Sequence, residues 1–100
     1  MNNEKKYFAL KLIPPRPSFP KDMTPEEQEI MQQHSLYWTN LMGTGIVVVY
    51  GPVMDPNGTY GFGIVEVDHE EQAMNITIED PAARILKYEC YPMLTIVPRK

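Results

Sequence analysis

His34 is the residue whose type and position best suit chemistry. It follows Ile30 by four positions and precedes Trp38 by four, so it falls on the apolar stripe of a predicted helix, where leucine would pack better. An imidazole there can take up or release a proton near neutral pH. It can equally be a half-buried histidine that only donates an N–H to a carbonyl. The sequence leaves both interpretations open.

Asp80 is the carboxylate that we pair with His34. It precedes Pro81 at a predicted helix boundary, where a loop can direct its side chain inward to orient an imidazole. A bare Asp-Pro pair is also a common turn former. The pairing is therefore a hypothesis about how the chain folds.

A ligand pocket is expected around this pair. Tyr37 and Trp38 would supply aromatic rings from the helix, and Phe62 would supply another from a strand. Gly51 and Pro52 follow a strand and could form a wall where backbone amides contact a ligand, although simple turn geometry explains them equally well.

Two glycines also leave the predicted strand over residues 60–67 without side chains at two positions. Gly61 and Gly63 share one face of that strand and leave it bare, whereas Phe62 and Ile64 share the other. This spacing predicts that something large approaches the strand at the glycines.

Metal and cofactor chemistry are not expected. Two histidines, scattered carboxylates and Cys90 give no spaced ligand cluster, and His69 stands at a solvated helix entry. The segment Gly43-Thr44-Gly45 lacks the lysine and the spacing of a nucleotide-binding loop. Cys90 lies in an apolar strand and is expected to be an inert buried thiol.

The composition limits the class of protein. One hundred residues, 43% of them hydrophobic, predict a single globular domain over residues 1–100. A net charge of −4 with no basic stripe disfavours nucleic-acid binding, and no apolar run approaches the roughly 20 residues of a membrane helix. A lone cysteine excludes an internal disulfide and favours a cytoplasmic location.

Periodicity predicts the first half of the fold. Residues 5–13 alternate as a strand with Phe8, Leu10 and Leu12 on one face. The prolines between 14 and 20 predict a stiff extended loop. Thr24 and Glu27 form a capping box for a helix that ends at Gly43. The β-branched run over 46–50 predicts a strand buried on both faces that ends at 51–52.

The second half repeats the pattern. Residues 55–58 read as a turn into the strand over 60–67. Asp68 is expected to cap a helix with Ala73, Met74 and Ile78 as its buried stripe, closing at 80–81 with a further turn possible over 82–86. A last strand covers 87–97, and Pro92 marks it as an edge or a bulge.

This βαββαβ order predicts an α+β, ferredoxin-like fold: a four-stranded antiparallel sheet with both helices on one face. Apolar residues stand on both faces of the strands, so the uncovered face would need a second sheet from another subunit. A homodimer is therefore expected.

The ordered features resemble the YCII-related family: His34 in the first helix, Gly51-Pro52, the segment 61–65, Asp80-Pro81 and the segment 88–98. The resemblance implies a dimeric α+β barrel and a His–Asp active-site pair at His34 and Asp80. The chain departs from the family in its longer proline-rich insert, 14–25. The arginine that often precedes the histidine is also absent, with 31–33 reading Met-Gln-Gln.

Two functions remain open from the sequence. One is a cofactor-free acid–base enzyme of lyase or isomerase type, acting on a small organic or aromatic metabolite through His34 and Asp80. The other is a non-catalytic module that binds a small ligand or a partner through the same pocket. Fold resemblance alone does not transfer an activity.

Overall fold

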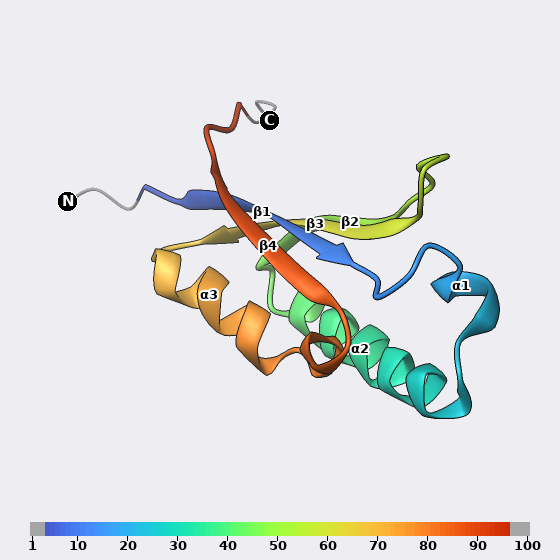
Figure 1. Cartoon of the computed structure of the whole chain (residues 1–100). Helices are drawn as coiled ribbons and strands as arrows, with labels where there is room; N and C mark the ends of the chain where they lie inside the picture. The colour runs from blue at the N-terminus through green and yellow to red at the C-terminus, as the bar shows by residue number, and fades with distance from the viewer. Residues whose placement is uncertain (1–3, 97–100) are drawn as a thin grey trace.

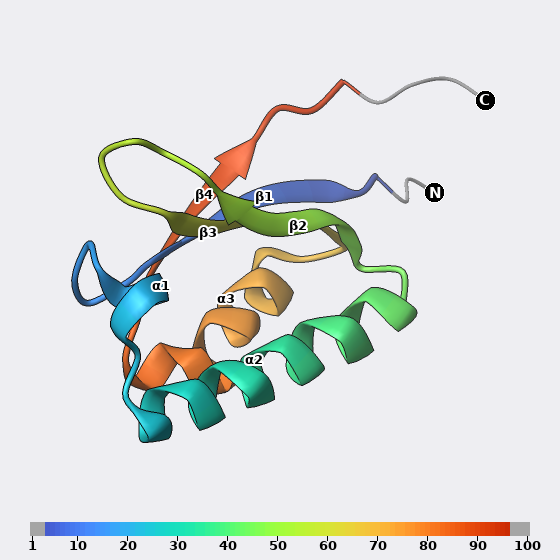
Figure 2. The ribbon, with the colours of Figure 1, turned by 90° about the vertical axis from the view of Figure 1, so that its right-hand side faces the viewer.

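The fold is one antiparallel sheet with its helices gathered on one face. A computed structural model describes residues 4–96. Strands β1 (Lys6–Ile13), β2 (Val47–Val53), β3 (Tyr60–Val67) and β4 (Lys87–Met93) pair in the order β2-β3-β1-β4. Helices α2 (Pro25–Gly43) and α3 (Glu70–Glu79) run beneath the sheet (Figures 1 and 2). The predicted α+β, ferredoxin-like topology is confirmed.

Helix α2 carries His34, and its start is fixed as the sequence predicts. The Thr24 hydroxyl accepts a hydrogen bond from the Glu27 amide at 3.1 Å, and the Glu27 carboxylate accepts one from the Thr24 amide at 2.9 Å. Pro25 occupies the first turn, where its missing N–H costs nothing. Beyond the helix, Gly45 adopts a φ of 86°, which glycine tolerates best.

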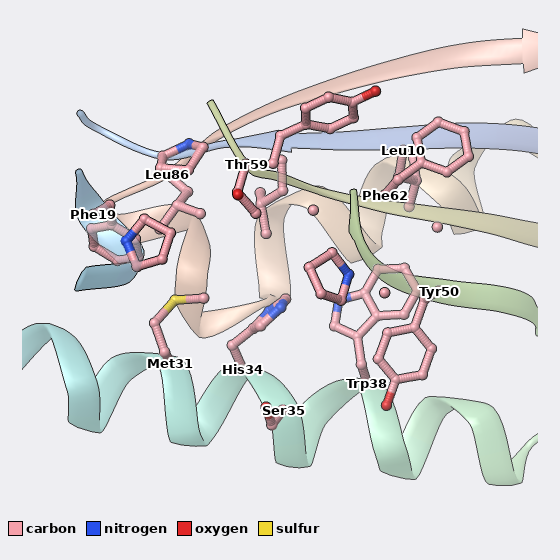
Figure 3. A pocket seen from close by; sticks show the side chains of 18 of the residues that line it. Leu10, Phe19, Met31, His34, Ser35, Trp38, Tyr50, Thr59, Phe62 and Leu86 are labelled. Carbon is pink, nitrogen blue, oxygen red and sulfur yellow. The ribbon is translucent and has the colours of Figure 1, made fainter. Parts of the chain in front are cut away.

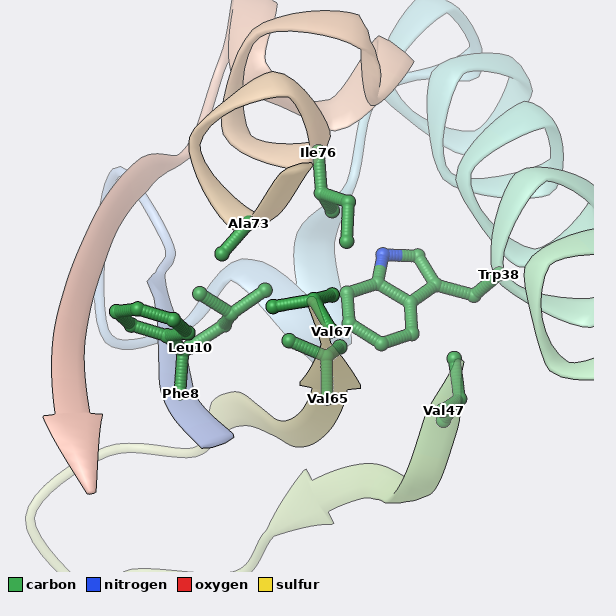
Figure 4. Close-up of a cluster of buried hydrophobic side chains, with 8 residues drawn as sticks. All are labelled: Phe8, Leu10, Trp38, Val47, Val65, Val67, Ala73 and Ile76. Carbon is green, nitrogen blue, oxygen red and sulfur yellow. The ribbon is translucent and has the colours of Figure 1, made fainter. Parts of the chain in front are cut away.

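The core lies between the sheet and the two main helices. Alternation along β1 buries Phe8, Leu10 and Leu12 as predicted. Figure 4 shows how the β1 and β3 side chains meet α3 and Trp38 of α2. The buried residues of this main cluster are Phe8, Leu10, Trp38, Val47, Val65, Val67, Ala73 and Ile76.

The proline-rich segment is not the fully extended loop that we predicted. It contains a short helix, α1 (Phe19–Asp22), with Pro20 in its first turn, where proline is tolerated. Phe19 is buried at the edge of the sheet–helix layer. The prediction considered only the prolines and did not include the burial of the Phe19 ring, which holds this short helix against the rest of the fold.

Strand β2 differs from the prediction in burial and in length. It forms an edge of the sheet, so Val48 and Val49 are about half exposed, at 53% and 52%, instead of covered on both faces. The strand also runs through Gly51 and Pro52 to Val53. An edge strand can carry a proline because one side of it needs no hydrogen-bond donor.

Helix α3 corrects two further predictions. His69, not Asp68, is the N-cap residue, and the amides of both donate to the Gln72 side chain. Ala73 is buried as predicted, but Met74 and Ile78 are exposed, Ile78 by 73%. Their place is taken by Ile76, which stands one turn from Ala73 on the same face.

The end of the chain follows the prediction in part. The further turn after Asp80-Pro81 is the 3₁₀ helix η1 (Pro81–Arg84). Strand β4 is an edge strand, as Pro92 indicates, but it ends at Met93. The predicted strand end at Val97 lies outside the described residues. Between residues 4 and 96, no helix is long and apolar enough to cross a membrane.

Candidate functional site

A cavity of about 300 Å³ opens between the sheet and α2. Figure 3 shows His34 rising from α2 into its middle, with Phe19 and Met31 toward one end and Trp38 and Tyr50 toward the other. This volume is at the lower end of small-molecule pockets. The remaining lining residues are Leu10, Leu12, Pro14, Pro20, Met23, Ser35, Gly51, Pro52, Thr59, Tyr60, Gly61, Phe62, Gly63, Leu86 and Tyr88.

His34 and Asp80 lie in direct contact. The imidazole Nδ1 is 2.8 Å from Asp80 Oδ2 and 3.0 Å from Oδ1. The His34 side chain is 17% exposed, whereas Asp80 is only 1% exposed. Because a carboxylate can only accept, Nδ1 donates to it, and the second ring nitrogen, Nε2, has no hydrogen-bond partner among residues 4–96. The contact spans 46 residues of sequence.

Asp80 is held by three further donors. Trp38 Nε1 donates to Oδ2 at 2.9 Å, the Tyr88 hydroxyl donates to Oδ2 at 2.5 Å, and the Ala82 amide donates to Oδ1 at 2.9 Å. Burial acts to raise the pKa of Asp80, but the hydrogen bonds from His34, Tyr88 and Ala82 outweigh it and hold that pKa below its usual value. The carboxylate therefore stays charged, and it acts on His34 as a fixed anion.

Tyr88 is the least expected member of this cluster. Its hydroxyl donates to Asp80 and accepts a hydrogen bond from Trp38 Nε1 at 3.1 Å. Burial, and then the hydrogen bond to Asp80 together with the Asp80 charge, raise the pKa of Tyr88 well above that of a free tyrosine. The hydroxyl thus stays protonated and remains a donor to the carboxylate.

The indole of Trp38 is seated against Gly63 of β3. A Cβ at position 63 would lie 2.9 Å from Trp38 Cη2 and 3.2 Å from Tyr50 Cβ. The Trp38 and Tyr50 rings lie beside each other with centroids 5.3 Å apart. The prediction that something large approaches the glycines is confirmed at Gly63, and the large group is Trp38 itself.

The predicted pocket residues fall in different places. Trp38, Gly51, Pro52 and Phe62 all border the cavity. Alternation along β3 points the Phe62 ring to the face opposite Gly61 and Gly63, where it pairs with Lys11. Tyr37 is not among the lining residues. It packs against the main core cluster, and burial, followed by Glu79 and Asp80, raises its pKa to about 12.

Several lining residues were missed from the sequence. Met31 precedes His34 by one turn and so shares its face, a spacing that could have revealed it. Strand alternation places Tyr88 on the inward face together with Cys90. The sequence does not show that its hydroxyl donates to Asp80, because the two residues meet only in the folded structure. Phe19 carried no periodic signal, because it stands between Pro17 and Pro20.

Other titratable groups stand apart from this site. No group of three or more His, Cys, Asp or Glu side chains among residues 4–96 is placed to hold a metal ion. Cys90 is half-buried, and burial raises its pKa. His69 is exposed at the start of α3.

The sheet order and the two helices on one face define an α+β protein of ferredoxin-like fold, with His34 and Asp80 in contact beside a pocket. The YCII-related domain model matches residues 8–96. The chain belongs to the YCII-related family, as the resemblance indicated. No curated protein matches the chain.

Proposed function

We propose that this protein is a cofactor-independent acid–base enzyme of lyase or isomerase type that acts on a small organic or aromatic metabolite. The observation that carries the proposal is the pairing of His34 Nδ1 with the buried Asp80 carboxylate, 2.8 Å apart, in the wall of a cavity. Asp80 is the positioning residue. His34, with Nε2 free, is the catalytic residue that exchanges a proton with the ligand.

The chemistry suits a substrate with one polar centre. Lining side chains are mostly aromatic or aliphatic, and none of them is lysine or arginine. A ligand rich in phosphate would find no cationic partner there apart from His34. A planar molecule with one carbonyl or hydroxyl at His34 could stack on Trp38 and Tyr50. His34 would take a proton from a carbon or oxygen beside that group and return it elsewhere on the molecule.

The proposal is tested by an activity screen followed by His34→Gln and Asp80→Asn. Loss of the proton-transfer group should lower kcat about 10²- to 10⁴-fold with a smaller change in KM. His69→Gln, on the exposed histidine, is the matched control and should turn over at the wild-type rate. A folded His34→Gln variant that turns over the best substrate at full rate would exclude His34 as the catalytic residue.

A non-catalytic binding module is the alternative, and the apolar lining favours it. In that case His34 only donates or accepts one hydrogen bond, and ligand affinity depends on Trp38 and Tyr50. Ligand binding without turnover, with no pH dependence near neutrality, would support the module over the enzyme.

We also propose that the protein works as a homodimer. The sheet face away from the helices carries apolar side chains that nothing in residues 4–96 covers, including Val49 and Tyr91, each 52% exposed. A second sheet packed there would bury them. Size-exclusion chromatography with light scattering should give a dimer at micromolar concentration, and Val49→Lys should shift it toward monomer. A wild-type monomer would contradict the proposal.

The remaining expectations stand as parts of this proposal. A cytoplasmic location rests on the single cysteine, Cys90, and on nothing structural. Neither nucleic acid nor membrane is proposed as a partner, because the net charge is −4 and the basic residues form no stripe.

A further inference from the structure

The proline-rich segment from Pro14 to Met23 borders the same cavity that His34 enters. Four of its residues line the cavity: Pro14, Phe19, Pro20 and Met23. Phe19 stands with Met31 of α2 at the end away from Trp38 and Tyr50 (Figure 3), and Met23 packs against the buried cluster that contains Phe19. We infer that this segment is the end wall of the pocket and sets the longest apolar ligand that fits between Trp38 and Phe19. The inference rests on the proposed function, in which the cavity holds a small apolar ligand.

The wall is anchored on its outer side by Arg16. Its guanidinium forms a bidentate pair with the Glu27 carboxylate, with Nη2–Oε1 at 2.8 Å and Nη1–Oε2 at 3.0 Å. It also bonds Asp22 through the side chain at 2.8 Å and through the carbonyl at 3.0 Å. Planar, paired contacts of this kind fix geometry as well as adding energy. Arg16 therefore ties α1 to the first turn of α2.

Glu27 joins this anchor to the helix that carries His34. The same carboxylate caps α2 by accepting from the Thr24 amide at 2.9 Å. Arg16, followed by the Thr24 amide, lowers the pKa of Glu27 to about 2. The carboxylate is thus ionised at any physiological pH, and the wall and the start of α2 are held by one charged group.

The wall is anchored on its inner side by Phe19. This ring is only 3% exposed and belongs to a second buried cluster with Leu12, Ala82 and Leu86. The Arg16 guanidinium lies 5.4 Å from the centroid of the ring, so the two anchors also touch each other. The prolines of the segment further restrict its backbone. A wall so fixed should exclude a ligand that is one or two methylenes too long.

Trp38 provides a direct readout, because it is the only tryptophan of the chain and lines the opposite end of the cavity. The probes are 4-n-alkylphenols with straight chains from ethyl to hexyl, titrated while Trp38 fluorescence is recorded. Affinity should rise about fourfold for each methylene that fits and then fall once the chain meets the wall. The chain length at maximum affinity measures the distance to the wall.

Met23→Ala should move that maximum to a longer chain, by about two methylenes, because it removes a flexible side chain from the wall. Met42→Ala is the matched control: it is the same substitution at an exposed position of α2 outside the cavity, and it should leave the maximum in place. Arg16→Gln keeps the buried residues and should broaden the maximum toward longer chains, with affinities for the short phenols within about twofold of wild type.

The outcomes separate this inference from the proposed function. Binding whose maximum is the same in wild type, Met23→Ala and Arg16→Gln would overturn the wall and leave the proposed site intact. A steady rise in affinity through the hexyl compound in the wild type would overturn the wall in the same way. If no alkylphenol changes Trp38 fluorescence or the melting temperature, the apolar ligand site fails, and the wall fails with it.

Discussion

The two halves of β3 differ in how they fill the space between the sheet and the helices. Gly61, Gly63, Val65 and Val67 all point toward the helices. The two valines are buried among Ala73, Ile76 and the β1 side chains, and they fill the space below the sheet (Figure 4). Gly63 leaves space into which Trp38 fits, and both glycines border the cavity. A single strand thus supplies core residues at one end and part of the cavity wall at the other.

Asp80 stands where the two halves meet. It follows α3, which covers the valine half, and it accepts hydrogen bonds from His34 and Trp38 of α2, which covers the glycine half. The difference between the halves shows that a strand can border a cavity while the residues around that cavity stay in fixed contacts. In the glycine half, where side chains fill less of the space, a buried carboxylate with all its hydrogen bonds made can keep the surrounding residues in place.

The largest effect is expected from Asp80→Ala. It leaves the Tyr88 hydroxyl and the Ala82 amide without their buried acceptor, and it leaves Trp38 Nε1 with only the Tyr88 oxygen as acceptor, so the free energy of unfolding should fall by about 3–5 kcal/mol. Urea unfolding followed by far-UV circular dichroism measures the loss. Glu66→Ala, which removes a half-buried carboxylate from the other sheet face, is the control. An equal loss of stability in the two variants would show that Asp80 stabilises the fold no more than Glu66 does.

Packing in the two halves should respond differently to truncation. Ile76→Ala in the valine half opens a void in a filled core and should cost about 2–5 kcal/mol. Met31→Ala beside the existing cavity should cost about 1 kcal/mol or less, because its space already adjoins an opening. The same urea measurement compares them. Equal costs would mean that the glycine half is packed as tightly as the valine half.

Filling the glycine half should also destabilise the protein. Gly63→Ala places a Cβ against the Trp38 ring and should cost about 1–3 kcal/mol, while shifting Trp38 fluorescence as the indole moves from Asp80. Gly51→Ala, with nothing within 4 Å of the added carbon, is the control on the neighbouring strand and should leave the fluorescence unchanged. An unshifted spectrum in Gly63→Ala would show that Trp38 does not depend on this glycine.

Acid should lower the stability of the folded protein through protonation of Asp80, which joins the glycine half to the valine half. Its pKa lies below the ordinary value of 3.8, so the folded protein binds this proton more weakly than the unfolded chain does. The stability that Asp80 contributes is present above the unfolded value and is lost as the pH falls through the lower folded value. Melting temperatures measured from pH 6 to pH 2 should therefore fall less steeply in Asp80→Asn than in the wild type. Parallel curves would contradict this.

The fold was predictable because its signals are local. Alternation over Phe8, Leu10 and Leu12, and the capping box at Thr24, depend on neighbouring residues and were confirmed. Predictions that needed tertiary knowledge failed: Val48 and Val49 look buried by composition but lie on an edge strand. On α3, Ile76 is buried instead of the predicted Met74 and Ile78, because the packing of the helix on the sheet decides which of its sides faces inward.

The site was predictable where it rests on periodicity. The helical stripe singled out His34 and Trp38, and the glycine spacing indicated where a large group approaches. The donors around Asp80 were not predictable in the same way. Tyr88 reaches it from β4 and Ala82 from η1, and no spacing in the sequence encodes that convergence. The burial of Phe19 beside the cavity was not predictable, because the surrounding prolines predicted only an extended loop.

The central feature of the candidate site is that Asp80 holds His34 with Nδ1 as the donor, while Nε2 has no hydrogen-bond partner among residues 4–96. Long-range ¹H–¹⁵N correlation spectra of the neutral imidazoles test this most directly, with exposed His69 as the internal reference. The structure predicts that His34 carries its proton on Nδ1 in the wild type and loses this preference in Asp80→Ala. An Nε2–H tautomer for His34 in the wild type would contradict the account.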